Sequence, residues 1–185
     1  MAIAYLNPSS SQLNTNWDSS TVSELDQGET SNTWQTTGQP AALTVLLDDF
    51  DNTGVSSITS VQLIIVGDYD ARSGSWIADT DIYNSSGSSF YQENLIIPAG
   101  RSASTVTGTV RTTSDGSTAW TDSDLDDMRI GLTSPNCGTS GQLIQFYIKV
   151  IYETGYGNNV NGVAAANIGK INGIATANIS KVNGI

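Results

Sequence analysis

Hydrophobic and polar residues alternate along much of this chain with the two-residue period of a half-buried β-strand. The pattern is clearest over residues 143–153, where one side of the predicted strand collects Ile144, Phe146, Ile148, Val150 and Tyr152. Similar runs, bounded by turn-forming residues, predict further strands over 42–50, 61–69, 75–83, 90–98 and 104–111. Roughly six to eight short strands at this spacing predict an all-β fold, an antiparallel β-sandwich of jelly-roll type.

The strand pattern also divides the chain into parts. Residues 1–40 are polar, with Trp17 and Trp34 as isolated anchors, and predict an edge strand or a segment that wraps the sandwich. The longest predicted strand ends near residue 154 and marks the end of the sandwich. A Gly- and Asn-rich stretch typical of a hinge follows it, and the repeats begin after that stretch. We therefore expect the sandwich at 41–154, the hinge at 155–160 and a separate tail at 161–185.

The composition supports a fold with little helix. Charged residues make up 14% of the chain, where about 25% is usual. Lys and Arg, which are common on helical surfaces, total only 7. One short helix is predicted at 121–128, TDSDLDDM, because Thr121 or Ser123 can cap it and its first turn is acidic.

The charge is distributed unevenly. Residues 1–153 hold all 18 acidic residues and five of the 7 basic ones, a net charge of −13, whereas Lys170 and Lys181 are the only charges that follow. An acidic body argues against nucleic-acid binding through the phosphate backbone. No apolar run approaches membrane-spanning length, and the start, MAIAYLNPSSS, has neither the basic nor the apolar region of a signal peptide. We expect no signal peptide and no membrane partner. The single cysteine, Cys137, excludes an intramolecular disulfide.

The tail repeats itself with a period of 11 residues. Residues 161–171, NGVAAANIGKI, and residues 172–182, NGIATANISKV, are identical at seven positions, and the final NGI begins a third copy. Repeats of this kind normally bury an apolar face against a neighbour.

Two local structures fit the repeat. Each copy can form a short helix that ends at Asn-Gly with a left-handed glycine cap. Alternatively, Asn-Gly can form a type I′ turn between the arms of a β-meander. The Ile spacing does not alternate and fits a helical period of about 3.67 residues, so the sequence favours the helix while leaving the β-structure open.

Neither form is stable by itself, because helices shorter than about 12 residues are marginal in water. The apolar side chains of the repeat therefore need a partner surface. We predict that they mediate oligomerisation or attachment through Val163, Ile168, Ile171, Ile174, Ile179, Val182 and Ile185.

The motif I-x-K-[V/I]-N-G-[V/I], present at 168–174 and 179–185, resembles the C-terminal repeats of virion structural proteins from tailed bacteriophages. The body is similar in style to the Ser-, Thr- and Asp-rich β-sandwich modules of such phages. In those modules a W-T-x-x-D-L segment like 120–125 precedes two closing strands, here 128–132 and 143–152. The resemblance implies a protein on the exterior of the particle, often a trimer, and it brings no catalytic residues.

Together these observations predict a virion structural protein that is made in the host cytoplasm. It would be displayed on the particle as a capsid decoration or head-fibre protein and held there by its repeats. A tail or collar fibre component is an alternative. The expected partners are sister subunits, with a homotrimer favoured, and other virion proteins such as those of the capsid or tail.

The sequence argues against an enzyme. It contains no His, which excludes the Ser-His-Asp triad and imidazole metal sites. Neighbouring Asp residues lie mostly at strand ends, where acids usually bind turn backbones. Asp122, Asp124 and Asp126 have the spacing of the first EF-hand ligands, but the later Gly and Glu of that loop are missing. We expect no catalytic residue, no metal and no cofactor.

A carbohydrate-binding β-sandwich module is the remaining alternative, because jelly rolls can bind glycans through aromatic side chains. Trp17 and Trp34 are the candidate contacts, for example to a glycan on the host surface. Trp76 and Trp120 lie in strand-like context and are expected in the core.

Overall fold

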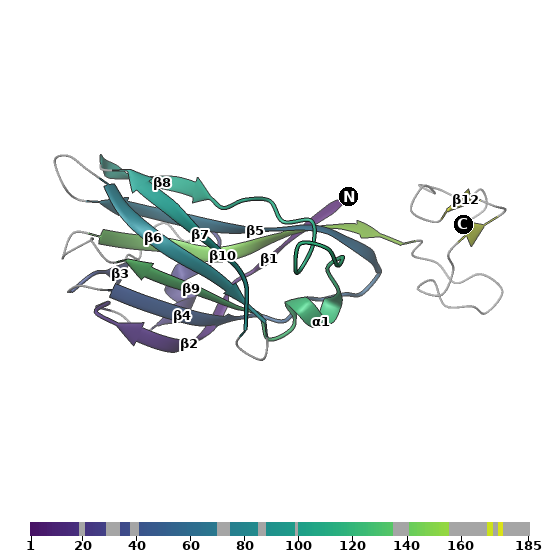
Figure 1. Ribbon diagram of the computed structural model, residues 1–185, viewed down its shortest axis with the longest axis horizontal. Coiled ribbons are helices and arrows are strands. Elements are labelled where there is room, and N and C mark those ends of the chain that lie inside the picture. Colours follow the sequence, from purple (N-terminus) through teal and green to yellow (C-terminus); the bar gives the residue numbers. More distant parts are fainter. Residues whose placement is uncertain are drawn as a thin grey trace.

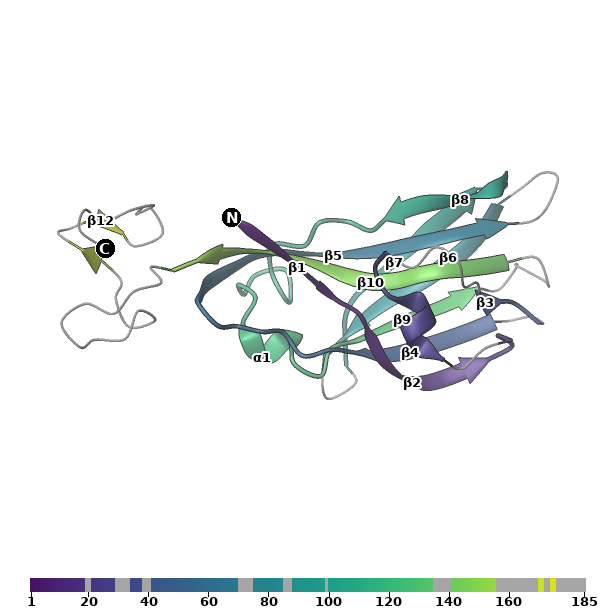
Figure 2. The same ribbon diagram turned by 180° about the vertical axis from the view of Figure 1, so that it is seen from behind.

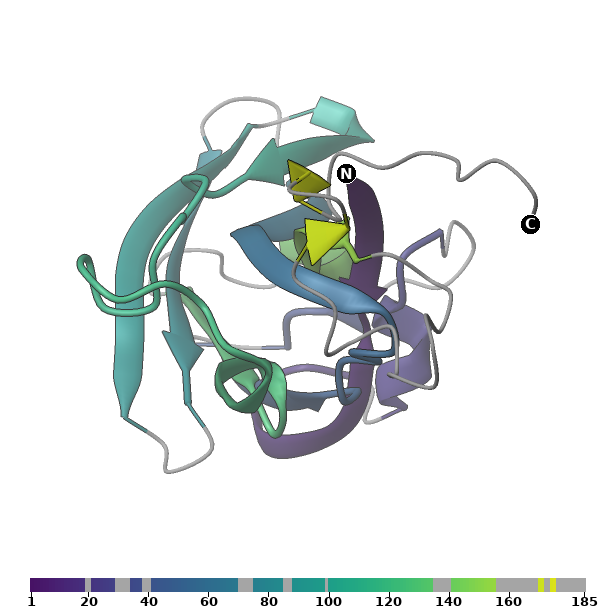
Figure 3. The same ribbon diagram turned by 90° about the vertical axis from the view of Figure 1, so that its right-hand side faces the viewer.

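The structure is a computed structural model that describes residues 1–18, 21–28, 34–37, 41–69, 75–84, 88–98, 100–134, 141–155, 170–171 and 174–175. Two antiparallel sheets pack face to face, which confirms the predicted β-sandwich (Figure 1). Seen along the sandwich, the sheets curve around the core between them (Figure 3). No helix among the described residues is long and apolar enough to cross a membrane.

The first sheet faces the viewer in Figure 2 and has the strand order β1-β10-β5-β8, with β3 also paired to β10. Its strands are β1 (Ala2–Leu6), β3 (Trp34–Gln35), β5 (Val55–Tyr69), β8 (Gly100–Thr107) and β10 (Gly141–Thr154). The second sheet faces the viewer in Figure 1 and has the order β2-β4-β9-β6-β7. Its strands are β2 (Pro8–Thr15), β4 (Ala41–Leu47), β6 (Ser75–Tyr83), β7 (Ser89–Pro98) and β9 (Arg129–Ser134).

This connectivity is that of a jelly roll. From β4 to β10 the chain passes repeatedly between the sheets, and only β6 and β7 follow each other as a hairpin in one sheet. The last long strand, β10, lies between β1 and β5, so sequence-distant strands form the centre of the first sheet. The jelly-roll prediction is therefore confirmed.

The N-terminal segment contributes an edge strand to each sheet. β1 pairs with β10 and β2 pairs with β4. The 3-10 helix η1 (Val22–Leu25) follows them and buries Leu25 completely. The sandwich thus begins at β1 rather than at residue 41, because residues 2–15 supply strands to both of its sheets.

The core lies between the sheets and includes Trp76 and Trp120, as the sequence predicts. The strand β10 departs from the predicted alternation at one point. A bulge between Leu143 and Gln145 places Leu143, rather than Ile144, in the buried set with Phe146 and Ile148. The α-helix α1 (Asp122–Leu125) forms where it was predicted, and the carboxylate of Asp124 accepts the backbone N–H of Thr121.

The described part of the tail is extended rather than helical. β11 (Lys170–Ile171) and β12 (Ile174–Ala175) pair antiparallel, with Ile171 opposite Ile174. The helix favoured from the Ile spacing is therefore wrong at this position. The helical period is weak evidence over so short a run, since periodicity alone does not separate helix from strand there.

Candidate ligand-binding face

The outer face of the second sheet carries polar side chains around the aromatic ring of Tyr83. On β6, Trp76, Ala78, Thr80 and Ile82 are buried, so the alternate residues point outward. Outward positions of the neighbouring strands complete the surface. We call this surface the Tyr83 face and define it by Asp79, Asp81 and Tyr83 on β6, Gln92 and Asn94 on β7, and Arg129, Gly131 and Thr133 on β9.

The strand register places each acidic residue of this face between uncharged neighbours. Asp79 lies opposite Asn94 on one side and Thr133 on the other. Asp81 lies in the next outward row, opposite Gln92 and Gly131. Gln92, Asn94 and Thr133 are exposed. Amide donors and acceptors therefore stand directly beside the two carboxylates.

Tyr83 lies across the glycine of the neighbouring strand. A Cβ added at Gly131 would stand 2.8 Å from Cε2 and 3.3 Å from the hydroxyl oxygen of Tyr83. Burial raises the pKa of Tyr83 to about 12, and the charge of Asp81 and its hydrogen bond to the phenol add to the shift. The phenol is therefore neutral at physiological pH. The ring lies on the sheet with its hydroxyl toward Asp81.

Ser89 connects Asp81 to the backbone of β7. Its hydroxyl lies 3.3 Å from Oδ1 of Asp81, to which it donates, and 3.3 Å from the carbonyl oxygen of Tyr91. Ser89 is the first residue of β7 and pairs with Tyr83, next to a register shift between Ile82 and Tyr83.

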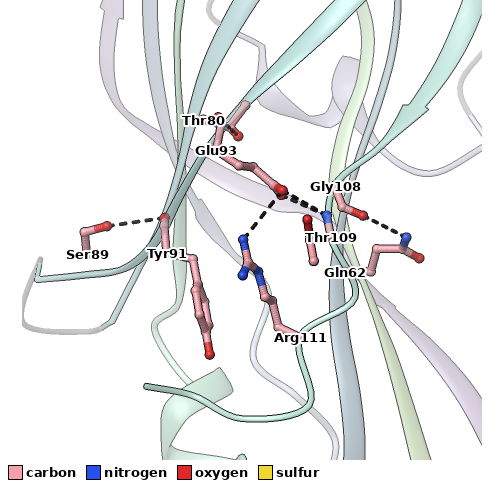
Figure 4. A network of polar contacts seen from close by, with 8 residues as sticks. All are labelled: Gln62, Thr80, Ser89, Tyr91, Glu93, Gly108, Thr109 and Arg111. Atoms are coloured by element: carbon pink, nitrogen blue, oxygen red, sulfur yellow. Dashed lines mark hydrogen bonds and ion pairs between the residues drawn. The ribbon is translucent and has the colours of Figure 1, made fainter. Parts of the chain in front are cut away.

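On its inward side β7 is held by a network of polar contacts around Glu93 (Figure 4). Oε2 of the Glu93 carboxylate accepts the backbone N–H of Thr109 at 2.9 Å and lies 3.6 Å from Nη2 of Arg111. The hydroxyl of Thr80 donates to the Glu93 carbonyl oxygen at 2.8 Å. Any side chain at position 108 would collide with the Glu93 carboxylate, so Gly108 permits this close approach. We call these contacts the Glu93 clamp.

The clamp continues into an aromatic cluster. The Arg111 guanidinium stacks 4.3 Å from the centroid of the Tyr91 ring, a cation–π contact. The Tyr91 hydroxyl donates to the carbonyl oxygen of Thr113 and accepts the N–H of Gly116 at 3.1 Å. The indole N–H of Trp120 donates to the Arg111 carbonyl oxygen at 2.9 Å.

The clamp has a structural role. Its single carboxylate is engaged by a backbone N–H and a guanidinium, whereas glycoside hydrolysis usually uses two facing carboxyl groups. By tying Tyr91 and Glu93 to residues 108–116, it fixes the strand whose outward side chains include Gln92 and Asn94.

The two tryptophans predicted to contact a glycan are buried. Trp34 is 0% exposed and its indole N–H donates to Oε2 of Glu24 at 3.0 Å. Trp17 is 7% exposed and packs edge-on against Trp76, with 6.1 Å between ring centroids. Both rings pack in the core of the sandwich, where a ligand cannot contact them. The prediction failed because an isolated Trp in a polar segment often anchors that segment to the core.

Tyr83 was not singled out from the sequence, although a signal for its face was present. The alternation in SWIADTDIY places Ile77, Asp79, Asp81 and Tyr83 on one side of the predicted strand. Which neighbours complete the surface depends on the pairing of β6 with β7 and β9, and local periodicity does not contain that information.

The remaining predicted site residues fall in two groups. Ile171 and Ile174 are paired across β11 and β12. Val163, Ile168, Ile179, Val182 and Ile185 lie outside the described residues. Within the described ranges, no group of three or more His, Cys, Asp or Glu residues has a geometry that could hold a metal ion.

The outer face of the first sheet has a different character. Tyr5 on β1 is 40% exposed and packs edge-on against Tyr147 on β10, with 5.7 Å between centroids. Ile3 is also exposed there. Among the described residues of the first sheet, no acidic pair like Asp79 and Asp81 lies beside these tyrosines, so this face provides an internal comparison for the Tyr83 face.

The chain matches no known protein family and no curated protein. Solved structures with a similar fold include the C-terminal CBM6 of LamC, a marine laminarinase from Zobellia galactanivorans (12% identity, TM-score 0.48, covering 80% of this chain and 98% of that one). The CBM35 of Abf62 from Cellvibrio japonicus aligns with 14% identity and a TM-score of 0.43, over 81% of this chain and 93% of that one. The enzymatically active domain of tailspike protein 4 from bacteriophage CBA120 aligns with 12% identity and a TM-score of 0.43, over 81% of this chain and 19% of that one.

Proposed function

We propose that this chain is a non-catalytic carbohydrate-binding β-sandwich module and that its ligand lies on the Tyr83 face. The observation that carries the proposal is the arrangement of Tyr83, whose ring lies on the sheet over Gly131. The next two outward rows of the sheet hold a carboxylate beside an exposed amide, Asp81 with Gln92 and Asp79 with Asn94.

The chemistry of this surface suits a sugar. The C–H groups on one side of a pyranose ring can pack on an aromatic ring, whose face carries partial negative charge. Sugar hydroxyls can donate to Asp79 and Asp81 and accept from the amides of Gln92 and Asn94. A few placed polar groups around an aromatic surface are the usual means by which a protein orients a small ligand.

A glycan array, followed by calorimetry on the best ligand, tests the proposal. Tyr83→Ala should weaken binding at least tenfold, because it removes the surface on which the sugar packs. Gln92→Ala and Asn94→Ala should each weaken binding about three- to tenfold, the usual effect of losing one hydrogen bond.

Tyr5→Ala is the matched control, since Tyr5 is a partly exposed tyrosine on the outer face of the other sheet. It should leave binding unchanged. Equal losses from Tyr5→Ala and Tyr83→Ala, or an array on which no glycan is retained, would overturn the assignment.

A second function is supported by the tail. We propose that the sandwich is displayed on the exterior of a phage particle and that the 11-residue repeats attach it there or join it into a trimer. The antiparallel pairing of Ile171 with Ile174 favours this role, because two paired strands of two residues each are not stable by themselves and need a partner surface. Removal of residues 158–185 should leave a folded sandwich that no longer trimerises or joins the particle. An unchanged mass by light scattering together with unchanged incorporation would contradict it. The two functions are compatible in one protein.

A further inference from the structure

The Tyr83 face has an uneven distribution of ionisable groups. Asp79 and Asp81 lie in two adjacent rows of this face, on the same strand and two residues apart. The cation of the face, Arg129, pairs with Tyr83 at its end. The phenol of Tyr83 adds no charge at physiological pH, far below its pKa of about 12. The rows of Asp81 and Asp79 are therefore the negative part of the face.

We propose that the Tyr83 face selects uncharged glycans and rejects glycans that carry uronate or sialate carboxylates. This inference rests on the proposed function and names the class of ligand that the same site accepts. A sugar seated on the Tyr83 ring lies over the rows of Asp81 and Asp79, so a carboxylate on that sugar or on the next one would face two like charges.

The neighbouring side chains reinforce this selection. Gln92, Asn94 and Thr133 are exposed and flank the two acids, and they offer neutral donors that do not compensate a ligand's charge. The whole chain adds to the effect, since residues 1–153 carry a net charge of −13.

Arg129 does not reverse the preference. Outward residues on a strand are spaced about 6.5 to 7 Å apart, and Arg129 is one outward row beyond Asp81 and two beyond Asp79. Arg129 lies in an end row of the face, beyond the rows of the amides. Arg129 therefore limits the rejection of acidic glycans without removing it.

Matched pairs of glycans test the inference with the full-length chain. Suitable pairs are hydroxyethylcellulose with carboxymethylcellulose, arabinoxylan with glucuronoxylan, and lacto-N-neotetraose with its sialylated form. At low ionic strength the neutral member of a recognised pair should bind about tenfold more tightly, the effect expected for two like charges several ångströms away in a hydrated site. Near 1 M salt the difference should disappear, because the Debye length falls to about 3 Å.

Charge-neutralising variants assign the effect to the face rather than to the whole chain. The double variant Asp79→Asn and Asp81→Asn keeps side-chain shape and should reduce the difference to about twofold or less. The control double variant, Asp115→Asn and Asp51→Asn, removes the same total charge from exposed loop positions outside the face. It should preserve the difference in affinity between neutral and acidic glycans. Arg129→Gln should increase the discrimination.

The outcomes separate this inference from the proposed function. Equal binding of both members of a pair at low salt, or tighter binding of the acidic member, overturns charge selection while leaving carbohydrate binding intact. A difference that persists unchanged in the double variant also overturns it. Binding to no member of any pair overturns the proposed function and this inference with it.

Discussion

Tyr83 and Gly131 lie so close across two neighbouring strands that a methyl group at position 131 would stand 2.8 Å from the Tyr83 ring. The three atoms nearest to such a methyl group all belong to Tyr83. The height of the ring above the sheet is therefore set by the absence of a side chain on the adjacent strand.

Gly131→Ala should displace the Tyr83 ring and weaken glycan binding about three- to tenfold, with a loss of unfolding free energy of about 1 kcal/mol. In a Tyr83→Ala background the same substitution should cost almost nothing, because the colliding atoms are gone. Urea denaturation of the four proteins of this cycle measures the coupling. Additive effects would mean that the two residues do not interact as described.

Tyr83 should ionise only at strongly alkaline pH, since burial and Asp81 raise its pKa to about 12. A raised pKa means that the folded state holds the proton more tightly than the unfolded state. The contribution of this group to stability is therefore complete below about pH 10 and is lost as the pH rises through 12. Ring NMR signals, assigned with Tyr83→Phe, measure the titration. Asp81→Asn should shift the midpoint toward 10, and an unchanged midpoint would exclude Asp81 as a cause.

Glu93→Ala should destabilise the protein by about 2 kcal/mol. The substitution removes the acceptor of the Thr109 N–H and leaves the partly buried guanidinium of Arg111 without its carboxylate. Glu93→Gln keeps one acceptor oxygen and should cost less. Glu153→Gln is the control, because its partner is the N-terminal ammonium of Met1, a residue whose side chain is 63% exposed. It should change stability by less than about 0.5 kcal/mol. If the two Glu93 variants unfolded at the same urea concentration as the control, the clamp would have no energetic role.

Asp115 should make the protein sensitive to acid. Its carboxylate accepts the backbone N–H groups of Thr118 and Ser117 and both of their hydroxyls, which holds its pKa well below the usual range. A lowered pKa stabilises the folded state above about pH 4, and the stabilisation is lost as the pH falls further through the folded-state pKa. The stability difference between wild type and Asp115→Asn should be largest near pH 7 and narrow below pH 4. A difference that is constant from pH 7 to pH 2 would contradict this role.

The sequence predicts the architecture of this protein better than the proposed binding surface. Strand identities followed from alternation, and the helix at Asp122–Leu125 followed from its capping residues. The bulge at Leu143 was not predictable, since it arises in the pairing of β10 with β5. The same limit applies to Tyr83, whose partner Gly131 is distant in sequence and adjacent only through the sheet. Trp17 and Trp34 were expected at the surface but are buried, because the local sequence of a polar segment does not determine whether the rest of the fold covers its tryptophan.

The position of β10 between β1 and β5 also has a consequence for biosynthesis. A nascent chain that stops before residue 141 contains both neighbours of β10 but not the strand that joins them. Until β10 is made, β1 has no partner in the first sheet, and the long edge of β5 that β10 covers is open to other strands. The sandwich therefore closes only after nearly all of its residues have been synthesised, and the interval before that closure is when the chain is most exposed to aggregation.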